Sequence, residues 1–334
     1  FRWDSEASIK AHVHCIIVGF SYHKSLNSRL FDSLGNVKLV ENINQYLTDA
    51  PTVIIESRSN PLCAVPHIRF GSMPRDGGGF ILNKSEKDEL IVREPLSKQW
   101  IRLYLGAEEF LKNKKRYCLW LLGANPAEIS KCPTVKARIQ SVRDFRLTSK
   151  AAGTRKFAET PSLFCQIAQP QTGCYIAVPK TSSERRRYIP LDFLDASVIA
   201  SDLLFLIPDA ALFHFGVLES NVHMAWMRTV CGRLKSDYRY SKDIVYNNFP
   251  WPTPTDAQKA KIEQTAQAIL DARALYLDCS LADLYDEATM PPELRKAHQQ
   301  NDRAVMEAYD MPVKGTTEAA CVAELMKRYQ ELTR

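Results

Sequence analysis

Residues 249–254 (FPWPTP) separate two parts of the sequence that have different apolar patterns. Upstream of them, short apolar runs alternate with turns rich in Gly and Pro, which is typical of strands and loops. Downstream, apolar residues recur every three or four positions, which is typical of helices that bury one face. The sequence therefore predicts an α+β chain, in which a mixed, sheet-containing domain precedes a small all-helical domain.

Three helices are predicted after this proline-rich segment. Thr255 and Gln258 have the spacing of a capping box, which opens a helix by satisfying its free N–H groups. Pro291 and Pro292 are expected to begin a second helix, because proline is tolerated in the first turn. Thr317 precedes a third.

Upstream, the predicted strands are residues 11–20, 52–56, 174–179, 184–190 and 201–208, and the predicted helices are residues 131–142 and 220–234. The strands at 11–20 and 52–56 belong to a piece too short to be a domain. We expect them to complete a sheet whose other strands come earlier. Since the sequence begins at Phe1 and not at Met, we expect it to be part of a longer polypeptide.

Several functional classes find no support in the sequence. No apolar run approaches the roughly 20 residues that a membrane helix requires, so no membrane association is expected. The cysteine count is odd, at nine, and none forms C-x-x-C, which predicts buried, reduced thiols. G-x-S-x-G, Walker-loop and H-E-x-x-H motifs are absent, so no catalytic residue and no metal site is predicted. His214 and His223 are expected to be core or interface residues.

The positive charge is concentrated in the middle of the chain. The whole sequence carries a net charge of +6, yet residues 131–190 alone contain 12 Lys and Arg against 3 Asp and Glu. Such a local excess is typical of a surface that binds a polyanion. A solvated charged face is the alternative explanation.

The first basic group alternates with small residues. Arg143, Arg146, Lys150, Arg155 and Lys156 lie within fourteen positions, together with Ala152, Gly153 and Thr154. Small residues permit close approach of the backbone, and Lys, Arg and Thr are common phosphate partners. We therefore expect this segment to contact a nucleic-acid backbone.

The second group, residues 184–188 (ERRRY), is predicted to be a strand. Alternate side chains of a strand share a face, so Glu184 and Arg186 would point the same way. A carboxylate can accept from cytosine and a guanidinium can donate to guanine, so the pair could read base edges. The residues alone slightly favour the alternative, an ordinary surface ion pair.

A third basic group is interleaved with two tyrosines. Its members are Arg233, Lys235, Arg239 and Lys242, with Tyr238 and Tyr240. This segment is expected to contact the nucleic-acid backbone or to stack on bases. The tyrosines could equally be packed inside the protein.

Longer motifs resemble a known family. They are residues 1–7 (F-x-W-x-S-E-A), 70–78 (F-G-S-M-P-x-D-G-G), 154–161 (T-R-K-x-A-E-T-P), 182–190 (S-S-E-R-R-x-Y-I-P) and 238–252 (Y-R-Y-S-K-D-I-V-Y-N-N-F-P-W-P). These strings resemble the C-terminal part of MmeI-like type IIG restriction–modification enzymes, in which an endonuclease is fused to an adenine-specific DNA methyltransferase. The likeness extends over nearly the whole chain.

The resemblance implies a domain division and a set of site residues. Residues 1–58 would be the tail of the methyltransferase domain, 59–254 a target recognition domain and 255–334 a helical C-terminal domain. Glu184, Arg186 and Ala152 match the base-reading positions of the family. Backbone contacts are expected from Arg143, Arg146, Lys150, Thr154, Arg155, Lys156, Arg239 and Lys242.

The resemblance also implies partners and cofactors. Double-stranded DNA and the upstream methyltransferase and nuclease domains would be the partners, in a bacterial cytoplasm. S-adenosylmethionine and Mg²⁺ are implied for the full-length parent but not for this fragment, because the cofactor-binding motif, the flipped-adenine motif and the nuclease carboxylates are absent from the sequence.

We therefore predict a sequence-specific DNA recognition module of a bifunctional enzyme. One alternative is a docking module for the upstream catalytic domains that contacts nucleic acid only nonspecifically. Another is a module that prefers single-stranded RNA over duplex DNA.

Overall fold

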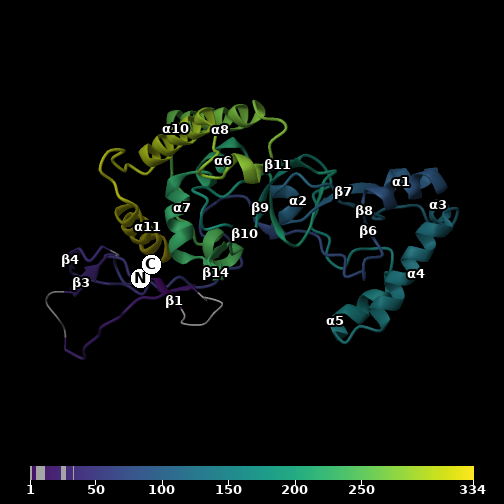
Figure 1. The fold of residues 1–334 in the computed structure, drawn as a ribbon, viewed down its shortest axis with the longest axis horizontal. Helices are drawn as coiled ribbons and strands as arrows, with labels where there is room; N and C mark the ends of the chain where they lie inside the picture. Colours follow the sequence, from purple (N-terminus) through teal and green to yellow (C-terminus); the bar gives the residue numbers. More distant parts are fainter. Residues whose placement is uncertain (1, 5–11, 24–27, 33) are drawn as a thin grey trace.

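A computed structural model describes residues 2–4, 12–23, 28–32 and 34–334. They form an elongated molecule with two lobes (Figure 1). One lobe contains the C-terminal helices, and the other ends in helices α4 (Pro133–Leu147) and α5 (Ala152–Arg155). Helix α2 (Ala107–Leu111) and two four-stranded sheets lie between these ends.

The central sheet has the order β11-β9-β13-β5, with all neighbours antiparallel. Its strands are β11 (Asp192–Asp195), β9 (Cys174–Pro179), β13 (Leu204–Pro208) and β5 (Arg69–Phe70). Successive residues of β9 and β13 enter different hydrophobic clusters, because side chains alternate across a strand. Ile176 and Phe205 join the main core, whereas Tyr175 and Leu204 join a smaller one beside α2. The sheet is thus covered on both faces.

The second sheet builds the core of the other lobe and has the order β12-β7-β8-β6. Its strands are β12 (Ile199–Ala200), β7 (Ile101–Leu105), β8 (Tyr117–Leu119) and β6 (Ile81–Leu82), of which β12 and β7 are parallel. Trp100, Leu119 and Phe164 pack there against Val135 and Val142 of α4. Helices α1 (Lys84–Arg93) and α3 (Pro126–Ile129) complete the lobe.

A third sheet, β10-β15-β14, consists of β10 (Thr181–Ser182), β15 (Asp237–Arg239) and β14 (Gly232–Leu234). The N-terminal region adds two hairpins. They pair β1 (Arg2–Asp4) with β2 (His12–His14), and β3 (Ser28–Phe31) with β4 (Val37–Val40).

The C-terminal part is helical, as its sequence pattern predicts. Helices α6 (Leu212–Leu218) and α7 (Asn221–Val230) precede α8 (Asp256–Ala274), α9 (Leu281–Leu284), α10 (Pro292–Ala308) and α11 (Glu318–Thr333). The predicted capping box is confirmed, since Thr255 and Gln258 bond reciprocally at the start of α8. Thr317 caps α11. These helices share one hydrophobic core with the central sheet, so the proline-rich segment does not separate two cores.

Some predicted strands are wrong. Only His12–His14 of residues 11–20 pairs as a strand; residue 11 lies outside the described residues, and Ile17 and Phe20 are 86% and 88% exposed. Residues 52–56 bury Val53 and Ile55 but form no strand, because side-chain amides such as that of Asn248 bind their carbonyl groups.

Other differences are smaller. The helix predicted at residues 220–234 ends at Val230, and Gly232 begins β14. The prediction of buried thiols is wrong for Cys174 and Cys279, which are exposed. No helix in the described part of the chain combines the length and apolar character needed to cross a membrane.

Gly71 provides a direct test of how the two large sheets meet. A Cβ atom on Gly71 would lie 2.0 Å from the backbone oxygen of Ser201, whereas one on Gly153 would meet nothing within 4 Å. We expect Gly71→Ala to lower the free energy of unfolding by about 3 kcal/mol or more, because backbone cannot move aside cheaply. Gly153→Ala is the matched control, and a urea titration of both variants checks the prediction. Equal stability of the two variants would contradict this packing.

Candidate nucleic-acid interface

The first basic group is largely exposed at the end of the lobe that contains α4 and α5 (Figure 1). Arg143, Lys150, Arg155 and Lys156 all have exposed side chains. Arg155 also shapes the loop before α5, because its Nη1 donates to the backbone oxygens of Ser149 (2.8 Å) and Lys150 (3.0 Å). Four exposed cations are thus available within residues 143–156 at this end of the lobe.

The small residues of this segment have different surroundings. Ala152 and Gly153 are exposed at the start of α5. Thr154 is only 6% exposed, and its hydroxyl accepts from Nη1 of Arg75 at 3.2 Å. The prediction that Thr154 contacts the DNA backbone is therefore wrong in this structure, since its hydroxyl faces the protein.

Arg146 is the clearest correction to the predicted phosphate contacts. Its side chain is 0% exposed and makes five hydrogen bonds, all to backbone carbonyl oxygens. The acceptors belong to Pro74, Arg75, Phe157, Thr160 and Leu163, at 2.7–3.1 Å. Its guanidinium therefore joins two loops to α4 and cannot contact a phosphate.

Residues 183–187, here called the reading turn, do not form the predicted strand. β10 ends at Ser182, and a turn follows in which the N–H of Arg186 donates to the oxygen of Ser183 at 3.1 Å. Strand alternation therefore cannot place Glu184 and Arg186 on one face. Glu184 is exposed and Arg186 is half-buried. Burial lowers the pKa of Arg186, and the charges of Asp237 and Asp286 oppose this shift.

The third sheet brings the reading turn beside the third basic group. Thr181 pairs with Arg239 and Ser182 with Tyr238. Arg239, Arg233 and Lys235 are exposed on the β14–β15 hairpin. Two groups that are about 50 residues apart in sequence are therefore neighbours in space.

For the two tyrosines of this third group, the alternative of packing inside the protein is confirmed. Tyr238 and Tyr240 are buried, so neither is available to stack on a base; the Tyr240 hydroxyl lies 3.0 Å from Nε2 of His223. Lys242 is 18% exposed at its side chain and is paired with Asp243. Its contact with a phosphate stays a prediction. His223 is a core residue, as expected.

Lys180 is a cation that the sequence reasoning missed. Its Nζ lies 4.2 Å from the centre of the Phe70 ring, and burial lowers its pKa. Phe70 is partly exposed. A Lys at the end of a buried strand was the available signal, but the ring comes from a strand more than 100 residues earlier.

The two basic surfaces lie apart. The reading turn and the β14–β15 hairpin belong to the lobe with the C-terminal helices, whereas α5 lies in the other lobe (Figure 1). Ala152 is therefore not a neighbour of Glu184, and any ligand that contacts both surfaces has to be extended.

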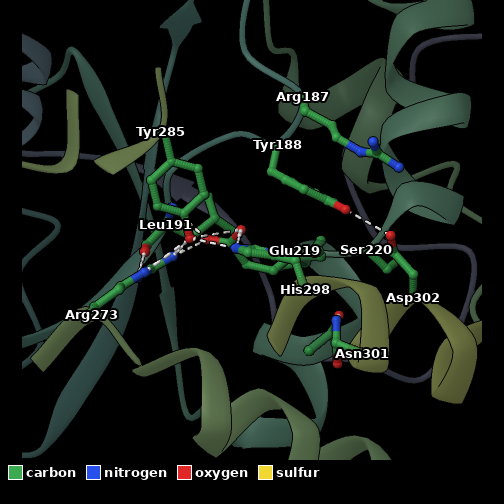
Figure 2. Close-up of polar contacts among 12 residues, drawn as sticks. Arg187, Tyr188, Leu191, Glu219, Ser220, Arg273, Tyr285, His298, Asn301 and Asp302 are labelled. Carbon is green, nitrogen blue, oxygen red and sulfur yellow. Dashed lines mark hydrogen bonds and ion pairs between the residues drawn. The ribbon is translucent and has the colours of Figure 1, made fainter. Parts of the chain in front are cut away.

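A buried polar network lies directly after the reading turn (Figure 2). Arg273 of α8 donates to the Glu219 carboxylate at 2.6 Å and to the backbone oxygen of Leu191 at 2.6 Å. The same carboxylate accepts from the N–H of Leu191 at 2.9 Å. Both charged side chains are buried, and Tyr285 bonds to Arg273 and to His298. The chain that leaves the turn is thus tied to the C-terminal helices.

Burial determines the protonation of this network. It raises the pKa of Glu219, an effect that Arg273 opposes, and it lowers the pKa of His298 well below its ordinary value. His298 is therefore neutral. Its Nδ1 faces the backbone oxygen of Glu219 at 3.3 Å, so Nδ1 carries the proton and Nε2 accepts from Tyr285.

Tyr188 and Asp302 form a second buried contact in the same region (Figure 2). The Tyr188 hydroxyl donates to Oδ2 of Asp302 at 2.7 Å, and the N–H of Asn221 donates to Oδ1 at 2.7 Å. Burial raises the pKa of Asp302 to about 6, and these hydrogen bonds oppose the shift. Within the described residues, no three His, Cys, Asp or Glu side chains come together as metal ligands.

Comparison with known proteins identifies the family. Residues 49–253 match the MmeI target recognition domain, and residues 254–334 match the MmeI C-terminal domain. The whole chain is 38% identical to "DNA methyltransferase A" of Bacillus subtilis (strain 168) and covers 38% of it. It also superimposes, with a TM-score of 0.90 and 44% identity, on 45% of the chain of MmeI, a type IIL restriction–modification enzyme solved in complex with DNA.

The fold thus defines a sheet-containing domain joined through a common core to a helical C-terminal domain. The chain belongs to the MmeI family and contains that family's target recognition and C-terminal domains. It spans less than half the length of both relatives.

Arg146 and Arg143 differ in burial on the same helix, which makes a matched pair for mutation. Arg146→Met removes a charged donor from five backbone carbonyl groups, of which those of Phe157 and Thr160 keep a backbone N–H donor. We expect it to cost about 3 kcal/mol or more. Arg143→Met is expected to change stability by less than about 0.5 kcal/mol. Thermal unfolding, with hydrogen exchange of residues 72–165, measures both. A similar small effect of the two substitutions would contradict the bracing role of Arg146.

The raised pKa of Asp302 predicts a pH-dependent stability. Because the folded carboxyl binds its proton more tightly than the unfolded one, stability is lost as pH rises from about 4 to about 6. Relative to Asp302→Asn, the free energy of unfolding should fall by about 3 kcal/mol across this interval. Urea titrations of both proteins at pH 4 to pH 7 test this. A difference that stays constant with pH would contradict it.

Proposed function

We propose that this chain is the DNA sequence-recognition module of a bifunctional restriction–modification protein. Family membership and the solved relative in complex with DNA support the proposal. The observation that carries it is the reading turn, which presents an exposed carboxylate and a half-buried guanidinium beside the basic β14–β15 hairpin. A turn anchored at both ends can hold such groups against base edges.

The proposed base-reading residues have complementary chemistry. Glu184 can accept a hydrogen bond from the amino group of cytosine, and Arg186 can donate two to guanine in the major groove. Ala152, exposed at the start of α5, can contact the methyl group of thymine. These three residues lie on two surfaces, which suits a ligand as long as a duplex.

The exposed cations are proposed to hold the DNA backbone. Arg143, Lys150, Arg155 and Lys156 serve one surface, and Arg239 serves the other. Each phosphate that a cation neutralises releases counterions, so binding is expected to weaken steeply with salt. Arg146 and Thr154 are excluded from this role by their burial and their contacts within the protein. Lys242 would have to exchange its pairing with Asp243 for a phosphate.

The activities of the longer parent are proposed as methylation of adenine at N6 and cleavage of DNA in a bacterial cytoplasm. S-adenosylmethionine would supply the methyl group, and Mg²⁺ would assist hydrolysis. Among the described residues no metal-ligand cluster is present, and the sequence lacks the cofactor-binding motif and the motif that receives a flipped adenine. Both groups would therefore bind upstream domains.

A docking role is the second candidate, and one observation favours it. Ile16, Ile17, Val18 and Phe20 are strongly exposed next to β2. Apolar side chains of this kind typically mark a contact surface, and the upstream domains of the same polypeptide would cover them. This role is compatible with sequence recognition, so the experiment has to measure base preference itself.

The test exchanges the charges of the reading turn in the full-length protein, as Glu184→Lys with Arg186→Glu. Duplexes with randomised positions are selected for binding and sequenced. We expect the preferred base pair to change at one position or more, because donors and acceptors are exchanged. The change in binding free energy should be about 1–3 kcal/mol for each base pair that the turn reads. An unchanged preference would rule out base reading by this turn.

Two controls separate base reading from general attraction. Glu331→Lys with Arg334→Glu makes the same charge exchange at exposed residues near the C-terminus, and it should leave the preference unchanged. Arg143→Ala with Lys156→Ala should weaken binding to all sequences alike and reduce the slope of log K against log salt by about 2, because both side chains are exposed.

A further inference from the structure

The reading turn contains few hydrogen bonds of its own. Among the described residues, the N–H groups of Arg185 and Arg186 donate to Ser183, at 3.3 Å and 3.1 Å. Its position is therefore determined by the elements that hold its two ends. At the N-terminal end this is the pairing of β10 with β15.

At the C-terminal end the turn is held by helices. Arg228 of α7 donates to the backbone oxygen of Arg187 at 2.8 Å, and Tyr188 donates to Asp302 of α10 at 2.7 Å. Figure 2 shows the Tyr188 side chain extending from this segment to Asp302. The ring of Tyr188 also stacks on His298, with centroids 4.1 Å apart.

The contact between Tyr188 and Asp302 is specific in its geometry. Both side chains are buried, and each carboxylate oxygen of Asp302 has one donor, the Tyr188 hydroxyl or the N–H of Asn221. Asp302 thus joins α10 to the start of α7 and to the end of the reading turn. Tyr188 is two residues from Arg186, which is at most about 7 Å of chain. The backbone position of Arg186 is therefore restricted by the position of Tyr188.

We propose that Tyr188 and Asp302 are positioning residues for sequence recognition, through which α10 sets the location of the reading turn on a base pair. The inference rests on the proposed function and extends it, because it makes the helical C-terminal domain part of the specificity apparatus. To discriminate between bases, donors and acceptors have to be held within tenths of an ångström. Electrostatic attraction to the DNA phosphates does not need this precision. The two residues should therefore affect selectivity more than affinity.

The test compares two buried tyrosine hydroxyls in the full-length protein. Tyr188→Phe removes the donor to Asp302, and Tyr309→Phe removes a hydroxyl that donates to the backbone oxygen of Pro250 at 2.8 Å. Both side chains are buried in the same core. Asp302→Asn is a third variant, of nearly unchanged shape. Duplexes with randomised positions are selected by each variant, and thermal unfolding is measured in parallel.

We expect Tyr188→Phe and Asp302→Asn to reduce the preference at the base pair read by the turn about fivefold. Binding to unrelated duplexes should change by less than about twofold. Tyr309→Phe should lower thermal stability by a similar amount and keep the preference. The double variant, Tyr188→Phe with Asp302→Asn, should lose no more selectivity than either single change, because the two residues act through one contact.

The outcomes distinguish the two levels of the proposal. If the Glu184 and Arg186 exchange alters the preferred sequence while Tyr188→Phe behaves like Tyr309→Phe, the positioning role is overturned and base reading by the turn stands. If neither change affects the preferred sequence, the proposed function of the turn fails. A loss of selectivity in the control as well would assign the effect to general destabilisation and overturn the specific role.

Discussion

The structure depends on the buried ion pair between Arg273 and Glu219. It joins α8 of the C-terminal region, the end of α6 and the backbone of Leu191 in one set of short hydrogen bonds. Desolvating two charges is expensive, and only complete pairing with additional hydrogen bonds offsets the cost. Loss of one partner would leave the other buried without its counter-ion, at a cost of about 3–5 kcal/mol. The ion pair therefore stabilises the packing of the helices against the sheet.

Arg146 is likewise a buried charge that joins separate segments in the other lobe, but its charge is stabilised in a different way. Its charge is surrounded by backbone carbonyl oxygens and not by a carboxylate. Carbonyl groups stabilise the guanidinium through their dipoles and are themselves satisfied as acceptors. The loops at residues 74–75 and 157–163 are thereby fixed to α4, so the neighbouring exposed cations have a defined position. In this lobe, a buried arginine thus stabilises the backbone from which the exposed arginines project.

These two anchors explain how a chain with short strands can present separated basic surfaces. β10 and β15 have two and three residues, too few to fix a loop by strand pairing alone. Contacts to α7, α8 and α10 supply the remaining constraints on the reading turn and the residues after it.

The sequence by itself determined the division into a sheet-containing part and a helical part, the capped starts of α8 and α11, and the middle block of positive charge. These features are local, since periodicity and capping depend on residues within a few positions of one another. Only the tertiary structure decided that Arg146 and Thr154 are internal and Arg155 is external, because burial depends on loops far away in the sequence. It also decided that residues 184–188 turn after Ser182, because strand β10 has its partner in β15 and the following residues are bound by helices more than 30 residues away.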